Sequence, residues 1–293
     1  MARARLSPSS EDVLATLRSF FEAHQDERYA RFSASLNPSP RPQVGVRMPV
    51  IRQKARAMIK AGESEAYLQA VQEAWQTEPS LAAESEWFTL GGILIGRDTH
   101  LPPELRDAAF LRWLSEVDGW GAADLLGSEQ HQLRTRPEWA WRFMHERVAA
   151  THIEEPATMW ATRVAIVIAL AHFRTAPWLD SLEALLTDPA LITALSMYNE
   201  RGEMRQPKPI TTPDGTRWPS AEGYYLSMAV AWCWASFFVV DPTRLEATLV
   251  RLNQTGRLDP WTCRRIVSKV RDSLAVSDEA KAHLKAVLIP REL

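Results

Sequence analysis

A tryptophan and an aspartate four residues apart, Trp120 and Asp124, are the side chains best suited to chemistry. They lie in the stretch Trp120-Gly-Ala-Ala-Asp124, which has a helical pattern. Residues four apart on a helix share one face, with Cβ atoms about 5–6 Å apart. Two later helical stretches carry Arg163 and Trp232. Together the four side chains predict an aromatic-walled site with one carboxylate and one guanidinium.

Asp124 lies in an otherwise apolar helical stretch. An unpaired carboxylate is costly in such surroundings, which favours a functional or paired aspartate over a decorative one. The tryptophans have a simpler alternative, because the chain has twelve of them and most tryptophans belong to a core. We expect four others to be core residues: Trp75, Trp87, Trp113 and Trp234. A structural salt bridge is the alternative role for Arg163.

The basic residues are unevenly distributed, although the formal net charge is only −2. Between residues 41 and 60 the chain has no acid and six bases: Arg41, Arg47, Arg52, Lys54, Arg56 and Lys60. Arg52, Arg56 and Lys60 are spaced at i, i+4 and i+8, so they form a stripe on one helix face. A second cluster near the C-terminus contains Arg264, Arg265 and Lys269. Such rows of cations suit a phosphate backbone; a solvated helix face is the alternative.

Composition indicates an ordinary globular chain of 293 residues, with 46% hydrophobic and 24% charged residues. No apolar run is long enough for a membrane span. The N-terminus has no apolar segment typical of a secretion signal. Two cysteines in separate apolar helices, Cys233 and Cys263, suit buried thiols in a reducing compartment. We therefore expect a cytoplasmic protein that has no contact with membranes.

Apolar residues recur at helical spacing along the whole chain, and no alternating run predicts a sheet. The expected helices are 10–24, 49–61, 63–76, 80–97, 102–117, 120–131, 138–149, 157–173, 176–187, 189–199, 221–240, 242–255, 260–272 and 277–288. Asp-Pro pairs at 188–189, 241–242 and 259–260 predict capped helix starts. Helical pairs every 35–45 residues favour a HEAT-like α-solenoid with a concave face, as a single domain over 1–293. A globular all-α bundle is the alternative.

One segment, at about residues 197–220, breaks the helical pattern with four prolines and two glycines. We interpret it as a long loop or short hairpin inserted between two helices. Long loops in compact domains are usually functional or linkers.

Four motifs occur in an order and spacing that resemble one known family. They are Gly45-Val-Arg-Met-Pro49 followed by Arg52, the Trp120/Asp124 pair, Trp160-x-x-Arg163-x-Ala165, and Ala229-x-x-Trp232. This arrangement resembles the AlkD-type DNA alkylation repair glycosylases over about residues 10–273. The resemblance implies a HEAT-like α-solenoid that binds duplex DNA in a basic groove and releases cationic N3- and N7-alkylpurines. On this hypothesis we expect a nucleoid-associated monomer that needs no cofactor.

The resemblance also implies roles for individual residues. Asp124 matches the catalytic aspartate, Trp120 and Trp232 match two site tryptophans, and Arg163 matches a phosphate-contacting arginine. The expected DNA-binding residues are the following: Arg163, Arg47, Arg52, Arg56, Lys60, Arg264, Arg265 and Lys269. Phe32 lies near a family tyrosine.

This chain departs from the family pattern at Gly121, where relatives commonly carry an aspartate. With Gly119 beside it, Gly121 is expected to make the helix start less rigid. The rival hypothesis is a non-enzymatic HEAT-repeat protein that binds DNA or a protein partner through the same groove. Other chemistries lack support, because we find no metal-ligand spacing among the histidines and cysteines, no nucleophile elbow and no P-loop.

Overall fold

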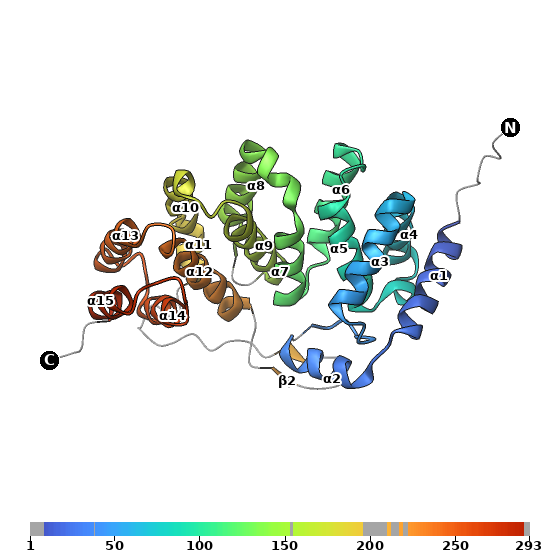
Figure 1. Cartoon of the computed structure of the whole chain (residues 1–293), viewed down its shortest axis with the longest axis horizontal. Helices are drawn as coiled ribbons and strands as arrows, with labels where there is room; N and C mark the ends of the chain where they lie inside the picture. Colours follow the sequence, from blue (N-terminus) through green and yellow to red (C-terminus); the bar gives the residue numbers. More distant parts are fainter. Residues whose placement is uncertain are drawn as a thin grey trace. The chain divides into compact units, whose positions relative to one another are not determined.

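The computed structural model describes residues 9–37, 39–152, 155–195, 210–211, 217–218 and 222–289. The fold is all-α and consistent with a helical repeat, as the sequence predicted. The described residues form two compact units (Figure 1). The first contains the described residues up to Gln132 with Thr211, Arg217 and Trp218; the second contains the rest.

The first unit is built from seven α-helices and one short 3₁₀ helix among the described residues. They are α1 (Ser10–Ala23), α2 (Glu27–Leu36), α3 (Met48–Ala61), α4 (Ser64–Thr77), η1 (Pro79–Ala82), α5 (Ser85–Arg97), α6 (Pro103–Ser115) and α7 (Trp120–Glu129). Helices α3, α5 and α7 form a row in that order, since α5 packs against both of the others. Helices α4 and α6 form a second layer beside α5, and α1 packs against α4.

The second unit repeats this two-layer arrangement. Its α-helices are α8 (Pro137–Ala149), α9 (Pro156–His172), α10 (Leu179–Leu186), α11 (Pro189–Leu195), α12 (Glu222–Phe238), α13 (Pro242–Gln254), α14 (Pro260–Arg271) and α15 (Asp278–Leu288). Helices α9, α12 and α14 form the row, while α8, α11, α13 and α15 pack beside it. Two 3₁₀ helices complete the helical set: η2 (His131–Thr135), which spans the division between the units, and η3 (Ala176–Trp178).

Local sequence signals explain where most helices begin. The side chains of Asp241 and Asp259 accept hydrogen bonds from the N–H groups of Arg244 and Thr262, at 3.0 and 2.9 Å. Each aspartate thus satisfies one backbone donor that has no partner inside its helix, and the following proline occupies the first helical position. The predicted Asp-Pro starts are confirmed here.

The core of each unit is aromatic. Trp75, Trp87 and Trp113 are buried in the first unit and Trp234 in the second, which confirms all four as core residues. Both cysteines are buried as predicted. Burial raises the pKa of the Cys233 thiol well above its ordinary range and that of Cys263 to about 12.

The segment predicted as an insertion is described only in part. Strands β1 (Ile210–Thr211) and β2 (Arg217–Trp218) pair with each other, as a short hairpin would require. The rest of 197–220 lies outside the described residues, as does the end of the helix expected at 189–199. Within the described ranges, every helix is too short or too polar to cross a bilayer. The single-domain reading stays a prediction.

Candidate functional site

Helix α7 carries the predicted catalytic pair in its first two turns. It begins at Trp120, after an extended Gly119. Asp124 follows one helical turn later, and both side chains are half-buried. The Trp120 indole Nε1–H donates to the carbonyl of Leu36 at 3.0 Å. Since Leu36 is the last residue of α2, this bond occupies a carbonyl that has no partner within α2 and fixes the indole against the end of α2.

Gly121 is held by a neighbouring side chain. Its N–H donates to Oδ1 of Asn37 at 3.0 Å, and a Cβ on residue 121 would stand 2.8 Å from the Asn37 amide nitrogen. Asn37 is the C-cap residue, directly after the end of α2. The missing side chain makes room for Asn37, which caps a first-turn donor of α7. The expectation that Gly121 makes the helix start less rigid stays a prediction.

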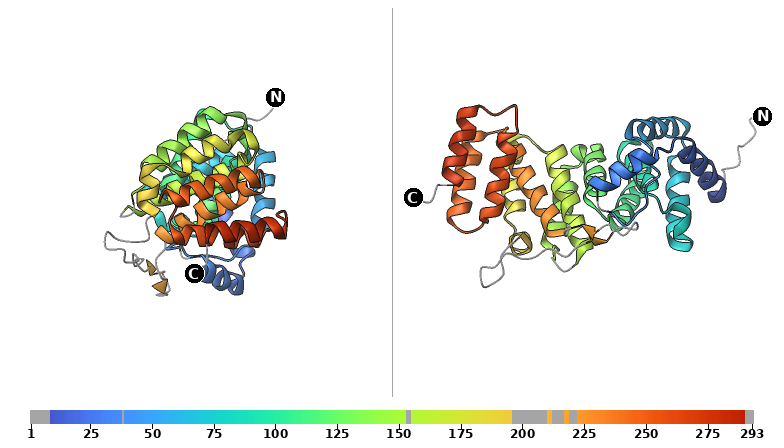
Figure 2. Two further views of the ribbon diagram at one scale, coloured as in Figure 1. Left: turned by 90° about the vertical axis from the view of Figure 1, so that its left-hand side faces the viewer. Right: turned by 90° about the horizontal axis from the view of Figure 1, so that it is seen from below.

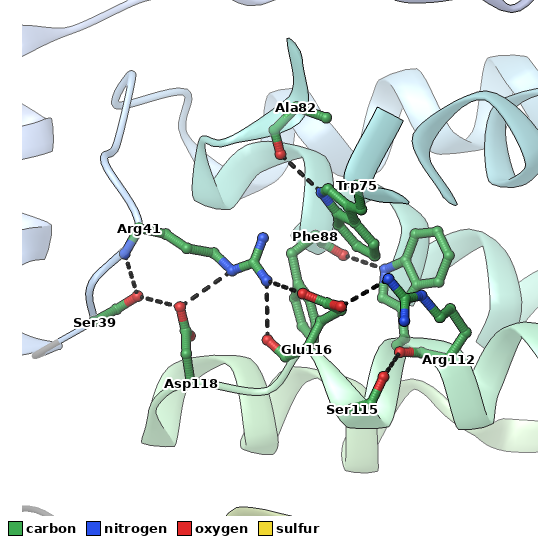
Figure 3. A network of polar contacts seen from close by, with 10 residues as sticks. Ser39, Arg41, Trp75, Ala82, Phe88, Arg112, Ser115, Glu116 and Asp118 are labelled. Carbon is green, nitrogen blue, oxygen red and sulfur yellow. Dashed lines mark hydrogen bonds and ion pairs between the residues drawn. The ribbon is translucent and has the colours of Figure 1, made fainter. Parts of the chain in front are cut away.

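The turn before α7 is clamped by a half-buried arginine, Arg41 (Figure 3). Arg41 donates from Nε to the Asp118 carboxylate at 3.1 Å, and from Nη2 to the backbone carbonyl and carboxylate of Glu116 at 3.1 and 2.9 Å. Ser39 donates to the same Asp118 oxygen at 2.9 Å. Burial raises the pKa of Asp118 above its ordinary value, against the lowering effect of Arg41. Arg41 thus positions the start of α7.

The chain between α2 and α3 is anchored by Glu86 of α5. Its buried carboxylate accepts hydrogen bonds from the N–H groups of Val44, Gly45 and Val46, at 3.1, 2.7 and 3.2 Å. Gly45 has a φ of 91°, and a Cβ there would stand 2.2 Å from the carbonyl of Asp26. Only glycine fits this left-handed, crowded position.

A cavity of about 210 Å³ lies in the first unit, between α2, α3, α5 and α7. Trp120, Gly121 and Leu125 form its α7 wall, and Arg41 and Asp118 also line it. One side of the predicted catalytic helix therefore borders a hollow lined by both polar and apolar side chains.

The first two cations of the basic run at 41–60 already have partners within the first unit. Arg41 is half-buried and pairs with Asp118 in the network of Figure 3. Arg47 pairs with Asp26 at 2.8 Å and lies over the Tyr29 ring at 4.8 Å. The Tyr29 N–H and Arg47 together hold the pKa of Asp26 below its ordinary value. These cations are thus occupied by contacts within the first unit.

The predicted stripe on α3 contains two exposed cations and one that is paired with a carboxylate. Arg56 and Lys60 are exposed. Arg52 pairs at 2.7 Å with Glu129, the buried last residue of α7. Arg97 of α5 pairs with the other oxygen of Glu129. One carboxylate therefore ties together the row α3–α5–α7, and Arg97 is a cation beside it that sequence reasoning missed because no basic neighbour marks it.

Arg163 of α9 is buried, with 5% of its surface exposed. Its Nη1 donates to the backbone carbonyl of Tyr225 in the first turn of α12. The ring of Trp160, one turn before Arg163, lies 6.1 Å from that of Tyr225. The guanidinium therefore joins α9 to α12, and its contact with a phosphate stays a prediction.

Trp232 lies on α12 and is 38% exposed, unlike Trp234 two residues later, which is 1% exposed. An indole on the surface of a central helix is available to a ligand, as the sequence hypothesis requires. Trp120 and Asp124 belong to the first unit, whereas Arg163 and Trp232 belong to the second. Their assembly into one site stays a prediction.

The C-terminal basic cluster is on α14, and its residues face different ways. Arg264, Arg265 and Lys269 are all exposed. Arg265 lies over the Trp261 ring at 4.9 Å, while Arg264 borders a hollow toward α15. Within the described part of the chain, no group of three or more histidine, cysteine, aspartate or glutamate side chains is arranged to hold a metal ion.

Comparison with known families identifies the class of protein. Residues 13–195 match the family model described as DNA alkylation repair enzyme, and this range covers more than half of the chain. The chain therefore belongs to the DNA alkylation repair enzyme family. This confirms the family resemblance that its four motifs indicated. The matched range includes Trp120, Asp124 and Arg163, and it ends before Trp232. No curated protein and no solved structure matches the chain significantly.

Proposed function

We propose that this protein is a DNA glycosylase that hydrolyses the N-glycosidic bond of cationic N3- and N7-alkylpurines in duplex DNA. Family membership supports a role in alkylation repair. The observation that carries the finer proposal is the placement of Asp124 one turn after Trp120, on a helix start fixed through Leu36, Asn37 and Arg41.

The proposed chemistry suits a single carboxylate. A cationic alkylpurine is already a good leaving group, so no general acid is needed. The reaction needs negative charge where the sugar becomes oxocarbenium-like, and a base for the water that attacks C1′. An ionised Asp124 supplies both. The faces of Trp120 and Trp232 add cation–π attraction to the charged sugar or base.

The proposed DNA contacts come from the exposed cations. Arg56 and Lys60 of α3 and Arg265 and Lys269 of α14 lie on helices of the two central rows and are exposed. Each phosphate that such a residue neutralises releases counterions, so affinity should fall steeply with salt. We assign Arg47 and Arg52 weaker contacts, because both guanidinium groups already pair with carboxylates.

Arg163 has a positioning role in this proposal. Its bond to Tyr225 holds the first turn of α12, and α12 carries Trp232. The proposed enzyme acts as a cofactor-free monomer on nucleoid DNA in the cytoplasm.

A substrate panel tests the proposal. The protein is incubated with duplexes that carry a single N7-methylguanine, N3-methyladenine or uracil, and abasic sites are detected by strand scission after alkaline treatment. Release of both cationic bases with uracil left intact is the expected result, because a neutral base is a poor leaving group without a general acid. Salt-sensitive binding of all three duplexes without base release would favour the non-enzymatic DNA-binding alternative.

A further inference from the structure

A cationic hollow of about 330 Å³ lies between α14 and α15, outside the residues that match the family model. The two helices pack side by side at the C-terminal end of the second unit (Figure 1 and Figure 2). Four cations from these helices line it: Arg264, Arg271, Lys281 and Lys285. We propose that this hollow is a phosphate-binding site.

The spacing of the cations along α14 and α15 places them on the two helix faces that line the hollow. Arg264, Ser268 and Arg271 follow each other at four and three residues on α14, so they share one face. Lys281 and Lys285 are four apart on α15 and share the facing side. Arg265 and Lys269 do not line the hollow. The site therefore uses Arg264 and Arg271 from the basic residues near the C-terminus, and adds Lys281 and Lys285.

The acids near the hollow leave a net positive charge. Asp278 lies 3.2 Å from Lys281 Nζ, and its side chain is 99% exposed. Asp272 lies 3.2 Å from Arg271 Nε and is 61% exposed. Exposed ion pairs are weak, so an incoming dianion displaces these carboxylates at little cost. Among the described residues, neither these two aspartates nor any other acid lines the hollow itself.

The donors suit a phosphoryl group in particular. Arginine offers a planar fork to two oxygens, lysine offers a point charge, and the Ser268 hydroxyl adds a further donor. Val267, Ala282 and Ile289 complete the lining with apolar surface. The phosphoryl group has two sources: the DNA backbone, or a small free phosphate compound. The proposal requires neither Asp124 nor base release, so it goes beyond the proposed function.

The first test is calorimetric titration of the full chain with pyrophosphate at low ionic strength. Arg264→Gln combined with Lys285→Gln should weaken binding at least tenfold. Arg142→Gln, on the exposed side of α8, is the matched control and should change it less than twofold. If the double variant does not melt cooperatively, Lys281→Gln is titrated in its place. This single substitution also removes a cation that lines the hollow.

The second arm identifies the source with an unmodified duplex, whose affinity is measured across salt concentrations. A backbone source predicts that the double variant lowers the salt slope by about 0.9 for each lost phosphate contact. A free-compound source predicts an unchanged slope together with lost pyrophosphate binding. Two results would overturn the proposal. In the first, the wild type binds pyrophosphate and the double variant binds it equally well. In the second, the wild type itself does not bind pyrophosphate and the double variant has the same salt slope as the wild type. Failure of base release with intact pyrophosphate binding contradicts only the glycosylase proposal.

Discussion

Asn37 and Gly121 fit together at the start of α7. The Asn37 Oδ1 accepts the Gly121 N–H at 3.0 Å, and a methyl group on residue 121 would stand 2.8 Å from the Asn37 amide nitrogen. Asn37, the residue directly after α2, therefore occupies the space that a side chain at position 121 would need. This contact fixes the helix that presents Trp120 and Asp124.

Gly121→Ala should lower the free energy of unfolding by about 1–3 kcal/mol, because the new methyl group forces Asn37 to move. Urea denaturation measures the change. Asn37→Ala removes the obstructing amide, so the double variant should lose less than the sum of the two single losses. Strictly additive losses would show that the two residues do not interact.

Trp120→Phe keeps an aromatic face beside Asp124 but removes the indole donor to Leu36. We expect a loss of about 0.5–1.5 kcal/mol in unfolding free energy, the net value of an ordinary hydrogen bond. We also expect base release to slow, because the ring is no longer fixed. Fluorescence-monitored unfolding and single-turnover assays report the two effects separately. Unchanged rates would argue that the position of the ring has no part in catalysis.

Stability should depend on the protonation of Asp118, whose pKa burial raises above its ordinary value of 3.8. A raised folded pKa means that the carboxyl's favourable contribution is complete below 3.8 and is lost as pH rises through the folded pKa. Asp118→Asn mimics the protonated form. The variant should therefore gain stability relative to wild type as pH rises from about 4 to 7. A gain that shrinks over this window would contradict the assignment.

Arg52 and Arg56 are neighbours on α3 with different expected roles. Arg52 pairs with buried Glu129, whereas Arg56 is exposed. Arg52→Gln should cost about 1–3 kcal/mol in stability, because it weakens the pairing of a buried carboxylate. Arg56→Gln should leave stability within about 0.5 kcal/mol and lower the salt slope of duplex binding by about 0.9. Equal melting temperatures for the two variants would contradict this division.

Much of the fold was predictable because local signals and packing agree. The Asp-Pro pairs 241–242 and 259–260 begin helices as expected, and Trp87 and Trp113 are core residues. Helix α2 was missed for a physical reason. Its apolar side chains Tyr29, Phe32 and Leu36 do fall at helical spacing, but the helix is short, has no buried residue and leaves Phe32 58% exposed, so it resembled an irregular connection.

The site was less predictable, because its supports come from distant parts of the chain. Arg41 reads as one cation of a basic run, yet its partners Glu116 and Asp118 lie more than seventy residues later. Asn37 and Gly121 are 84 residues apart. Sequence spacing placed Trp120 and Asp124 on one helix face, but the contacts that hold that face depend on tertiary packing.

Asp124→Asn tests the central claim most directly. Wild type, Asp124→Asn and the control Glu104→Gln, an exposed acid of α6, are compared on a duplex with a single N7-methylguanine under single-turnover conditions. We predict at least a hundredfold loss of base release in Asp124→Asn, about 2.7 kcal/mol of barrier, with unchanged duplex affinity and full activity in the control. Base release at the wild-type rate by a folded Asp124→Asn variant would contradict the assignment of Asp124 as the catalytic carboxylate.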